Sequence, residues 1–315
     1  RLLPGARDLH VGVATDEDRG LGRILRNSIL RPTCYAPFTR KCTDEETNMS
    51  ITRRQFLAQT AAATSISLLP SAHVYANAPE ASMKLGLVTY LWGQHWDLPQ
   101  IIKNCSAAGI SGVELRTQHA HGVEPSLSKT ERVEVRKRFE NSPVELVGYG
   151  SNAQYHESDQ EKLKKNIELT KSYIKLMHDC GGSGVKVKPN GFTKGVSNEK
   201  TIQQIGESLN EVAAFGADYG QKIRLEVHGR GTQELPNIKA IMDVAIHPNV
   251  GVCWNCNETD LAGDGIVQNF NMVKDRFADI VHVREMNIGN YPYEKLMQMF
   301  VAMKYNGWIL LECRT

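Results

Sequence analysis

The sequence predicts an α/β protein with the fold of a (β/α)8 TIM barrel whose last helix is missing from this chain. From Lys84 onward, eight short runs rich in β-branched residues alternate with stretches of helical periodicity. The whole alternation occupies about 230 residues, the length typical of one such barrel. The eighth run ends three residues before Thr315, so no covering helix is expected after it.

The eight predicted strands are short and are separated by helical segments. A doubly wound open sheet is the rival fold, and it normally carries a glycine-rich phosphate loop after its first strand. The segment Tyr90-Leu-Trp-Gly-Gln-His95 is not such a loop, which favours the barrel. The strands are predicted over 84–90, 112–117, 144–148, 184–188, 222–227, 250–254, 280–284 and 308–312.

Capping residues and apolar spacing predict the helices between these strands. Asp97 is placed to cap a helix that Gly109 ends. The run Ser158-Asp-Gln-Glu161 has the pattern of a capping box before the next long helix. Apolar residues from Ile202 to Tyr219 recur at the spacing of one helical face.

The segment before the barrel has the features of an export signal. Arg53-Arg54 followed by Phe56-Leu57 matches the twin-arginine pattern, and a small-residue cleavage signal ends at Ala76. We therefore predict an upstream, disordered extension at 1–48, a twin-arginine signal peptide at 49–76 and the barrel domain at 77–315. The twin-arginine translocation machinery is then a partner and the periplasm the destination. The apolar run is too short for a stable membrane anchor.

Charge and cysteine content exclude several classes of protein. Residues 1–76 carry ten of the 37 basic and seven of the 35 acidic residues, which leaves 27 basic and 28 acidic residues in the barrel region. This near-neutral body predicts no nucleic-acid partner. The seven cysteines form no disulfide framework or zinc pattern. Cys253 and Cys256 flank the end of a predicted strand, where structural thiols are expected rather than a redox pair.

Strand alternation predicts which polar side chains point into the barrel. Apolar residues of one phase, such as Val281 and Val283, should pack on helices, so His282 between them should face the barrel axis. Active sites of barrels lie at the carboxyl ends of the strands. The polar residues of the inward phase near those ends are Glu114, Lys186, Glu226, His228, Asn255, His282 and Glu312.

Four of these inward residues have the donor types of a divalent-metal site. Glu226, His282 and Glu312 would ligate with two carboxylates and one imidazole, and Asn255 with its amide oxygen. Oxygen-rich donors favour Mn²⁺ or Mg²⁺, with Co²⁺ or Zn²⁺ as alternatives. Each residue also has a structural explanation, since an inward Glu is often ion-paired and a buried His is often hydrogen-bonded.

Three motifs resemble the sugar phosphate isomerase/epimerase family of xylose-isomerase-like TIM barrels. They are L-E-V-H at Leu225–His228, H-V-R-E at His282–Glu285 and L-L-E at Leu310–Glu312, and the resemblance spans residues 84–315. It implies that Glu226, Asn255, His282 and Glu312 hold the metal. The sequence departs from the family at Asn255, where an Asp is usual. The family also has a companion His a few residues past that Asp. This His is absent here, and Glu258 lies in that region.

The resemblance implies proton abstraction next to the carbonyl of a sugar or keto-sugar, with Glu226 and Glu312 as the acid/base pair. Glu114, Arg116, Lys186, His228 and Arg284 are the candidates for binding the substrate. A keto-sugar or inosose dehydratase and a non-catalytic carbohydrate-binding barrel are the alternatives. The related apurinic endonucleases would need a richer His/Asp/Glu set and a basic face. The sequence leaves the sugar and a homo-oligomeric state open.

Overall fold

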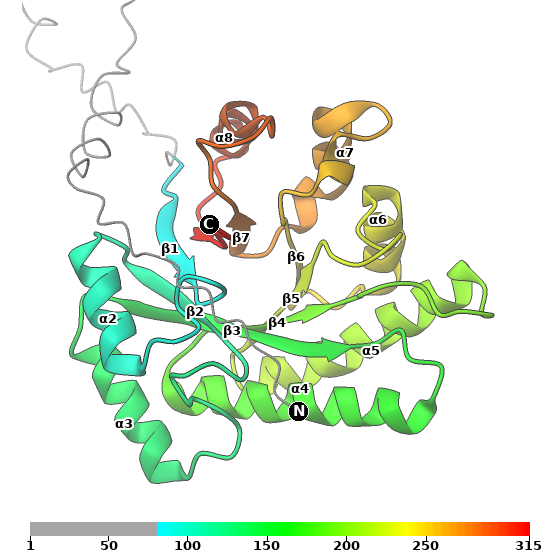
Figure 1. The fold of residues 1–315 in the computed structure, drawn as a ribbon. Coiled ribbons are helices and arrows are strands. Elements are labelled where there is room, and N and C mark those ends of the chain that lie inside the picture. The colour runs from blue at the N-terminus through cyan, green and yellow to red at the C-terminus, as the bar shows by residue number, and fades with distance from the viewer. Residues whose placement is uncertain (1–80) are drawn as a thin grey trace, which may run out of the picture. The chain divides into compact units, whose positions relative to one another are not determined.

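Eight parallel strands form a single sheet that curls into a nearly closed barrel (Figure 1). The computed structural model describes residues 81–315, and all statements below concern that part of the chain. The described residues belong to one compact unit. The predicted extension at 1–48 and signal peptide at 49–76 therefore lie outside the described residues.

The strands follow one another around the barrel in the order β6-β5-β4-β3-β2-β1-β8-β7. Between β6 and β7 two backbone hydrogen bonds replace a ladder, from Ala278 N to Val252 O and from His282 N to Trp254 O, both at 2.8 Å. These bonds bring the two ends of the sheet together. The bounds are β1 (Lys84–Val88), β2 (Gly112–Arg116), β3 (Glu145–Gln154), β4 (Gly184–Lys188), β5 (Lys222–Glu226), β6 (Val250–Cys253), β7 (Ile280–Val283) and β8 (Trp308–Leu311).

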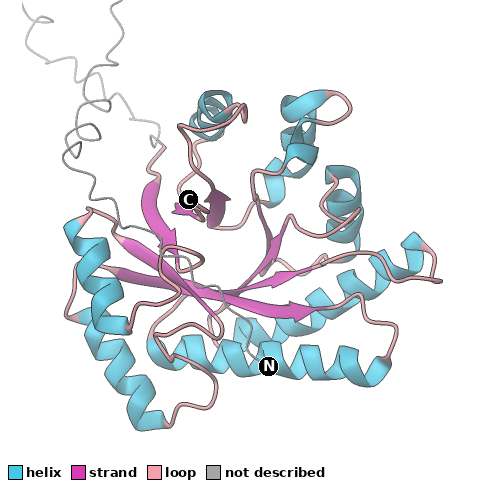
Figure 2. Cartoon of the chain, in the orientation of Figure 1, coloured by secondary structure: helices cyan, strands magenta, loops and turns pink. Residues whose placement is uncertain are grey.

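A helix follows each of the first seven strands and packs outside the barrel (Figure 2). Within residues 81–315 no helix follows β8, and none is long and apolar enough to cross a membrane. The predicted (β/α)8 TIM barrel is thus confirmed. The helices are α2 (Leu98–Ala107), α3 (Lys129–Glu140), α4 (Gln160–Cys180), α5 (Asn198–Asp218), α6 (Leu235–Val244), α7 (Gly265–Val273) and α8 (Tyr293–Ala302).

Capping residues in the sequence predicted where two of the helices begin, and one of these predictions needs correction. The carboxylate of Asp97 accepts a hydrogen bond from Gln100 N at 2.8 Å, so its predicted role as the cap of α2 is confirmed. For α4 the predicted cap Ser158 is wrong. Asp159 is the cap, and its side chain accepts from Glu161 N and Lys162 N at 2.9 and 3.3 Å. A carboxylate in this position accepts hydrogen bonds from two otherwise free N–H groups. Its negative charge also interacts favourably with the positive end of the helix dipole.

Strand alternation separates two apolar cores. On β8, Ile309 joins the large core between sheet and helices, whereas Trp308 and Leu310 lie in a smaller core inside the barrel. Glycines make room for large inner side chains. A Cβ on Gly112 would come within 2.4 Å of the Trp308 ring. The interior near the amino ends of the strands is therefore filled, and the space available to a ligand lies at the carboxyl ends.

Candidate functional site

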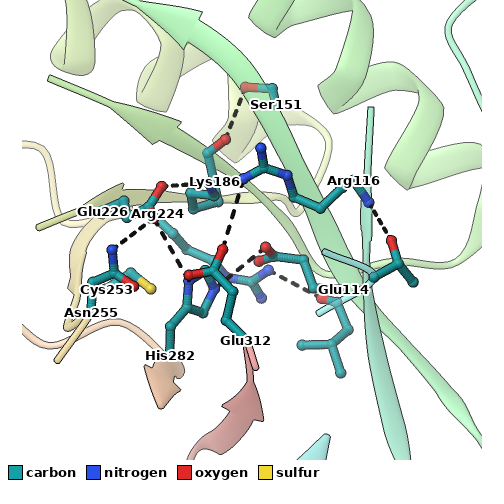
Figure 3. A network of polar contacts seen from close by, with 12 residues as sticks. Glu114, Arg116, Ser151, Lys186, Arg224, Glu226, Cys253, Asn255, His282 and Glu312 are labelled. Carbon is teal, nitrogen blue, oxygen red and sulfur yellow. Dashed lines mark hydrogen bonds and ion pairs between the residues drawn. The ribbon is translucent and has the colours of Figure 1, made fainter. Parts of the chain in front are cut away.

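Six polar side chains meet inside the barrel at the carboxyl ends of the strands (Figure 3). Each comes from a different strand or from the residues directly after it, and each has the inward phase that alternation predicts. All six are at most 7% exposed. Apolar neighbours of opposite phase, such as Val281 and Val283, pack in the outer core. The six residues are Glu114, Lys186, Glu226, Asn255, His282 and Glu312.

Glu226, His282 and Glu312 form a cluster with the dimensions of a metal site. Each offers one ligand atom, and these atoms lie within 4.8 Å of one another. His282 Nδ1 lies 3.9 Å from Glu226 Oε1 and 3.7 Å from Glu312 Oε2. Donors on different sides of one ion stand about 3–5 Å apart, because each bond to the ion is about 2.0–2.6 Å long. The cluster is thus consistent with a divalent cation.

Unpartnered buried atoms support the same interpretation. Asn255 Oδ1 and both ring nitrogens of His282 are buried and form no hydrogen bond. Buried polar atoms are normally hydrogen-bonded, so unpaired ones need an explanation, such as an ion. The amide of Asn255 is turned so that Nδ2 donates to Glu226 Oε1 at 3.0 Å. Its carbonyl oxygen is the atom of Asn255 that remains available for a cation.

Lys186 contacts the second oxygen of Glu226. Its Nζ donates to Glu226 Oε2 at 2.5 Å, and the two side chains are 0% and 2% exposed. Burial by itself would raise the pKa of Glu226, but Lys186 and His282 outweigh it and hold that pKa well below its ordinary value. Glu226 therefore stays ionised, with Oε2 occupied by Lys186.

Glu114 lies on the other side of the His282 ring, with its Oε1 3.4 Å from Nε2. Burial would lower the pKa of His282, yet the neighbouring Cys253, Glu114 and Glu312 raise it well above its ordinary value. A metal-ligating imidazole must lose that proton, so binding of a cation here would release it. Glu114 thus contacts the ring of His282, and Lys186 contacts the carboxylate of Glu226.

A cavity of about 450 Å³ opens above the cluster. Glu226, Asn255 and Glu312 form its floor, and its wall carries three of the predicted substrate-binding residues, Arg116, His228 and Arg284. The other two, Glu114 and Lys186, are fully buried and do not line it. Their contact with substrate stays a prediction, while the structure gives them partners within the cluster.

The sequence interpretation missed several cavity residues. Lys188, Asn257 and Tyr90 line the wall, as does Glu258, which the sequence placed near the site without a role. Lys188 had a signal, since it follows Lys186 by two residues and shares its inward phase. Asn257 lies in the irregular segment after β6, where alternation no longer predicts direction.

The described cysteines take no part in the cavity. All five are buried and free, as expected of structural thiols. Burial raises the pKa of Cys256 well above its ordinary value. A thiol in that state is a poor nucleophile and a poor metal ligand. Cys253 and Cys256 are therefore not a disulfide in this structure, and the chemistry of the site belongs to the carboxylates, the imidazole and the cations.

Comparisons with known proteins agree with this architecture. The family model described as xylose isomerase-like TIM barrel matches residues 102–315. A probable endonuclease 4 from Pediococcus pentosaceus is 26% identical over 133 residues, which cover 41% of this chain. The same match covers 44% of that protein, so the chain corresponds to less than half of this curated relative.

Two solved structures illustrate the shared fold. The 3-keto-D-glucoside 4-epimerase YcjR from E. coli superposes with a TM-score of 0.63 at 14% identity, over 74% of this chain and 94% of that one. The IOLI protein with a bound zinc atom gives a TM-score of 0.63 at 15% identity, over 73% of this chain and 88% of that one. At such identities these likenesses show the fold alone.

Proposed function

Because this chain belongs to the xylose isomerase-like TIM barrel family, we propose that it is a metal-dependent isomerase or epimerase of a sugar or keto-sugar. The observation that carries the proposal is the cluster of Glu226, His282 and Glu312, in which Glu226 and Glu312 line the floor of a polar cavity and His282 is buried beside them. We propose that this cluster, with the Asn255 carbonyl oxygen, holds a divalent cation. Mn²⁺ or Mg²⁺ suits its oxygen-rich donors best.

A bound cation would supply the Lewis acidity that polarises a substrate carbonyl and lowers the cost of removing the adjacent proton. Glu226 and Glu312 would then act as base and acid, since both reach the cavity and arise from strands on different sides of the floor. Lys186 fixes Oε2 of Glu226 and thereby directs Oε1 toward the cation site. Arg116 Nη1 lies 3.9 Å from Glu312 Oε1 and forms an ion pair with it.

The same site could complete a second reaction. If the carbanion next to the carbonyl expels a hydroxide instead of regaining a proton, the product is that of a keto-sugar or inosose dehydratase. No residue in the cavity distinguishes the two outcomes, because both begin with the same proton abstraction. A non-catalytic carbohydrate-binding barrel is the remaining alternative, and it predicts sugar binding without proton exchange.

The partial match to an endonuclease carries less weight. Within residues 81–315 the only group of three or more candidate His, Cys, Asp or Glu ligands is Glu226, His282 and Glu312. That group provides for one cation, whereas a site for several zinc ions would need more donors. We therefore propose a sugar and not a nucleic acid as the partner.

Deuterium exchange tests the proposal. The protein is loaded with Mn²⁺ and incubated in D₂O with a panel of sugars, keto-sugars and their acids. We expect deuterium at a carbon next to a carbonyl in at least one compound, together with its isomer, epimer or dehydration product. Binding of a panel member without any exchange would favour the carbohydrate-binding barrel instead.

We also propose that the barrel acts outside the cytoplasm. The support is the twin-arginine pattern at Arg53-Arg54 and the cleavage signal ending at Ala76, both in the segment before the described residues. The translocation machinery that reads this pattern carries folded proteins, so the metal site could be filled before export.

A further inference from the structure

The wall of the cavity has a strong excess of positive charge. Apart from the carboxylates of the floor, its charged residues are one acid, Glu258, and four bases. Charged groups of one sign in a confined cavity raise the local concentration of ligands of the opposite sign. The four bases are Arg116, Lys188, Arg284 and Arg314.

Two of these cations converge on one neutral acceptor. Asn152 Oδ1, on β3, accepts from Lys188 Nζ at 3.1 Å and from Arg116 Nη2 at 3.5 Å. Arg116 comes from β2 and Lys188 from β4, the strands on either side of β3. The ring of Tyr90 lies 5.6 Å from the Arg116 guanidinium and helps to orient it. The fold therefore holds two positive groups close together at one side of the cavity.

These cations lack the counterions that such a position normally requires. Among residues 81–315, Lys188 forms no ion pair, and the one carboxylate near Arg116 is Glu312 at 3.9 Å. Glu312 also faces His282, at 3.7 Å, and so belongs to the floor. Arg116 Nε is buried without a hydrogen-bond partner, and so is Nε of Arg284, which also lines the cavity. Unpaired buried N–H groups of a cation cost stability unless a ligand satisfies them.

The pKa of Lys188 is lowered by its buried position next to other positive groups. Burial, first, and then the neighbouring charge of Lys186 lower the pKa of Lys188 to about 8. Arg116 contributes in the same direction. A negative group placed between Lys188 and Arg116 would remove this penalty, because it favours the charged form of Lys188.

We propose that the substrate carries an anionic group, a carboxylate or a phosphate, which Arg116 and Lys188 bind beside Asn152. This inference rests on the proposed function and refines it: the substrate class is a sugar acid or sugar phosphate, not a neutral sugar. The carbonyl end of the substrate lies over the Glu226–Glu312 floor and the anionic end at the wall. Neutral hydroxyls would leave Lys188 without a counterion, whereas an anion supplies charge-assisted hydrogen bonds to both Lys188 and Arg116.

The test compares three ketohexose derivatives that share a carbonyl and differ in charge: a neutral ketohexose, a ketohexonate and a ketohexose phosphate. Exchange in D₂O gives kcat/KM for each. We expect at least tenfold preference for one of the two anionic compounds over the neutral one, and which anion is preferred identifies the carboxylate or the phosphate. A preference for the neutral ketohexose would overturn the proposal.

Substitutions at Lys188 test whether this residue causes the preference for an anionic substrate. Lys188→Gln should reduce the ratio of kcat/KM for the anionic over the neutral compound about tenfold, since one charged hydrogen bond is worth about that factor. Lys188→Arg should retain most of the preference. Lys194→Gln is the matched control, because Lys194 is exposed and lies outside the cavity. An unchanged ratio in Lys188→Gln would contradict the assignment.

Equilibrium binding separates this inference from the proposed function. A hexonate without a keto group cannot exchange its protons at such a site, but it should bind, and calorimetry measures its affinity. We expect at least tenfold weaker binding to Lys188→Gln than to Lys194→Gln. That result with no exchange in any compound would retain the anion site and reject the isomerase. Equal hexonate binding by the two variants would reject the anion site.

Discussion

Lys186 Nζ and Glu226 Oε2 form an ion pair of 2.5 Å in which both side chains are buried. Removing one partner of a buried pair leaves an unpaired charge, which is more costly than the pair itself. The pair also fixes one oxygen of Glu226, so the other, which accepts from Asn255 Nδ2 and faces His282, is the one on the side of the proposed cation. This contact links the stability of the barrel to the geometry of its site.

Replacing Lys186 tests that link. Lys186→Met should lower the free energy of unfolding by about 3–5 kcal/mol, as expected for a buried charge that loses its partner. Urea unfolding measures the loss, and saturating Mn²⁺ should recover part of it by neutralising Glu226. Lys188→Met is the matched control on the same strand and should cost less than about 1 kcal/mol, because Lys188 has no ion pair to lose. Equal losses in the two variants would argue against a special role for the pair.

Changing Asn255 tests the amide position of the proposed metal site. Asn255→Asp places a carboxylate where Nδ2 now lies 3.0 Å from Glu226 Oε1, so the metal-free protein should melt at a lower temperature than the parent. Mn²⁺ affinity should rise at least tenfold, because ligand charge tunes such sites. Calorimetric titration after dialysis against chelator measures the affinity. Asn255→Ala removes the amide without adding charge, and a gain in affinity there would contradict this explanation.

Asp260 should give the barrel a distinct pH dependence. Burial raises the pKa of its carboxyl to about 7, against the hydrogen bonds that Tyr291 and Asn257 donate to it. Since the folded pKa exceeds the unfolded one, Asp260 stabilises the fold most below about pH 4, and this contribution is lost as the pH rises toward 7. Asp260→Asn should therefore gain stability relative to the parent between those values, by on the order of 1–4 kcal/mol. Urea unfolding from pH 4 to 8 measures the difference, and a flat difference would be inconsistent with a raised pKa.

Replacing the two arginines of the predicted signal peptide tests the export prediction. Replacing Arg53-Arg54 with two lysines should leave the precursor in the cytoplasm, because the translocation machinery reads the arginine pair. Cell fractionation and sequencing of the mature N-terminus provide the measurement. Unchanged delivery to the periplasm, or a mature start well before Ala76, would reject the signal peptide.

Sequence alone predicted the barrel and the direction of its inner side chains, because both follow from alternation within each strand. His282 between Val281 and Val283 is an example, since two apolar residues on the outer face leave its direction fixed. β3 was predicted too short, ending at 148 instead of Gln154. Gly148 and Gly150 interrupt its apolar pattern there, and a Cβ on Gly148 would come within 2.7 Å of the backbone oxygen of Gly184.

Contacts between distant strands could not be predicted in this way. Alternation placed Lys186 and Glu226 in the same interior, but their pairing depends on the register of β4 against β5, where Val187 lies opposite Leu225. The amide orientation of Asn255 and the meeting of Arg116 with Lys188 at Asn152 depend on packing across three strands. These details decide which group faces the cation and which faces the substrate.

The most direct test of the central claim measures bound metal and deuterium exchange in the same preparations. The parent protein should bind one Mn²⁺ and exchange the proton next to a substrate carbonyl, and it should lose the exchange on chelation. Glu226→Ala, His282→Ala and Glu312→Ala should each lose both properties, because two protein donors and an amide hold a labile cation poorly. Glu258→Gln, which removes a cavity carboxylate outside the cluster, should keep the metal. Retention of Mn²⁺ by the three alanine variants, or exchange that survives chelation, would contradict the account.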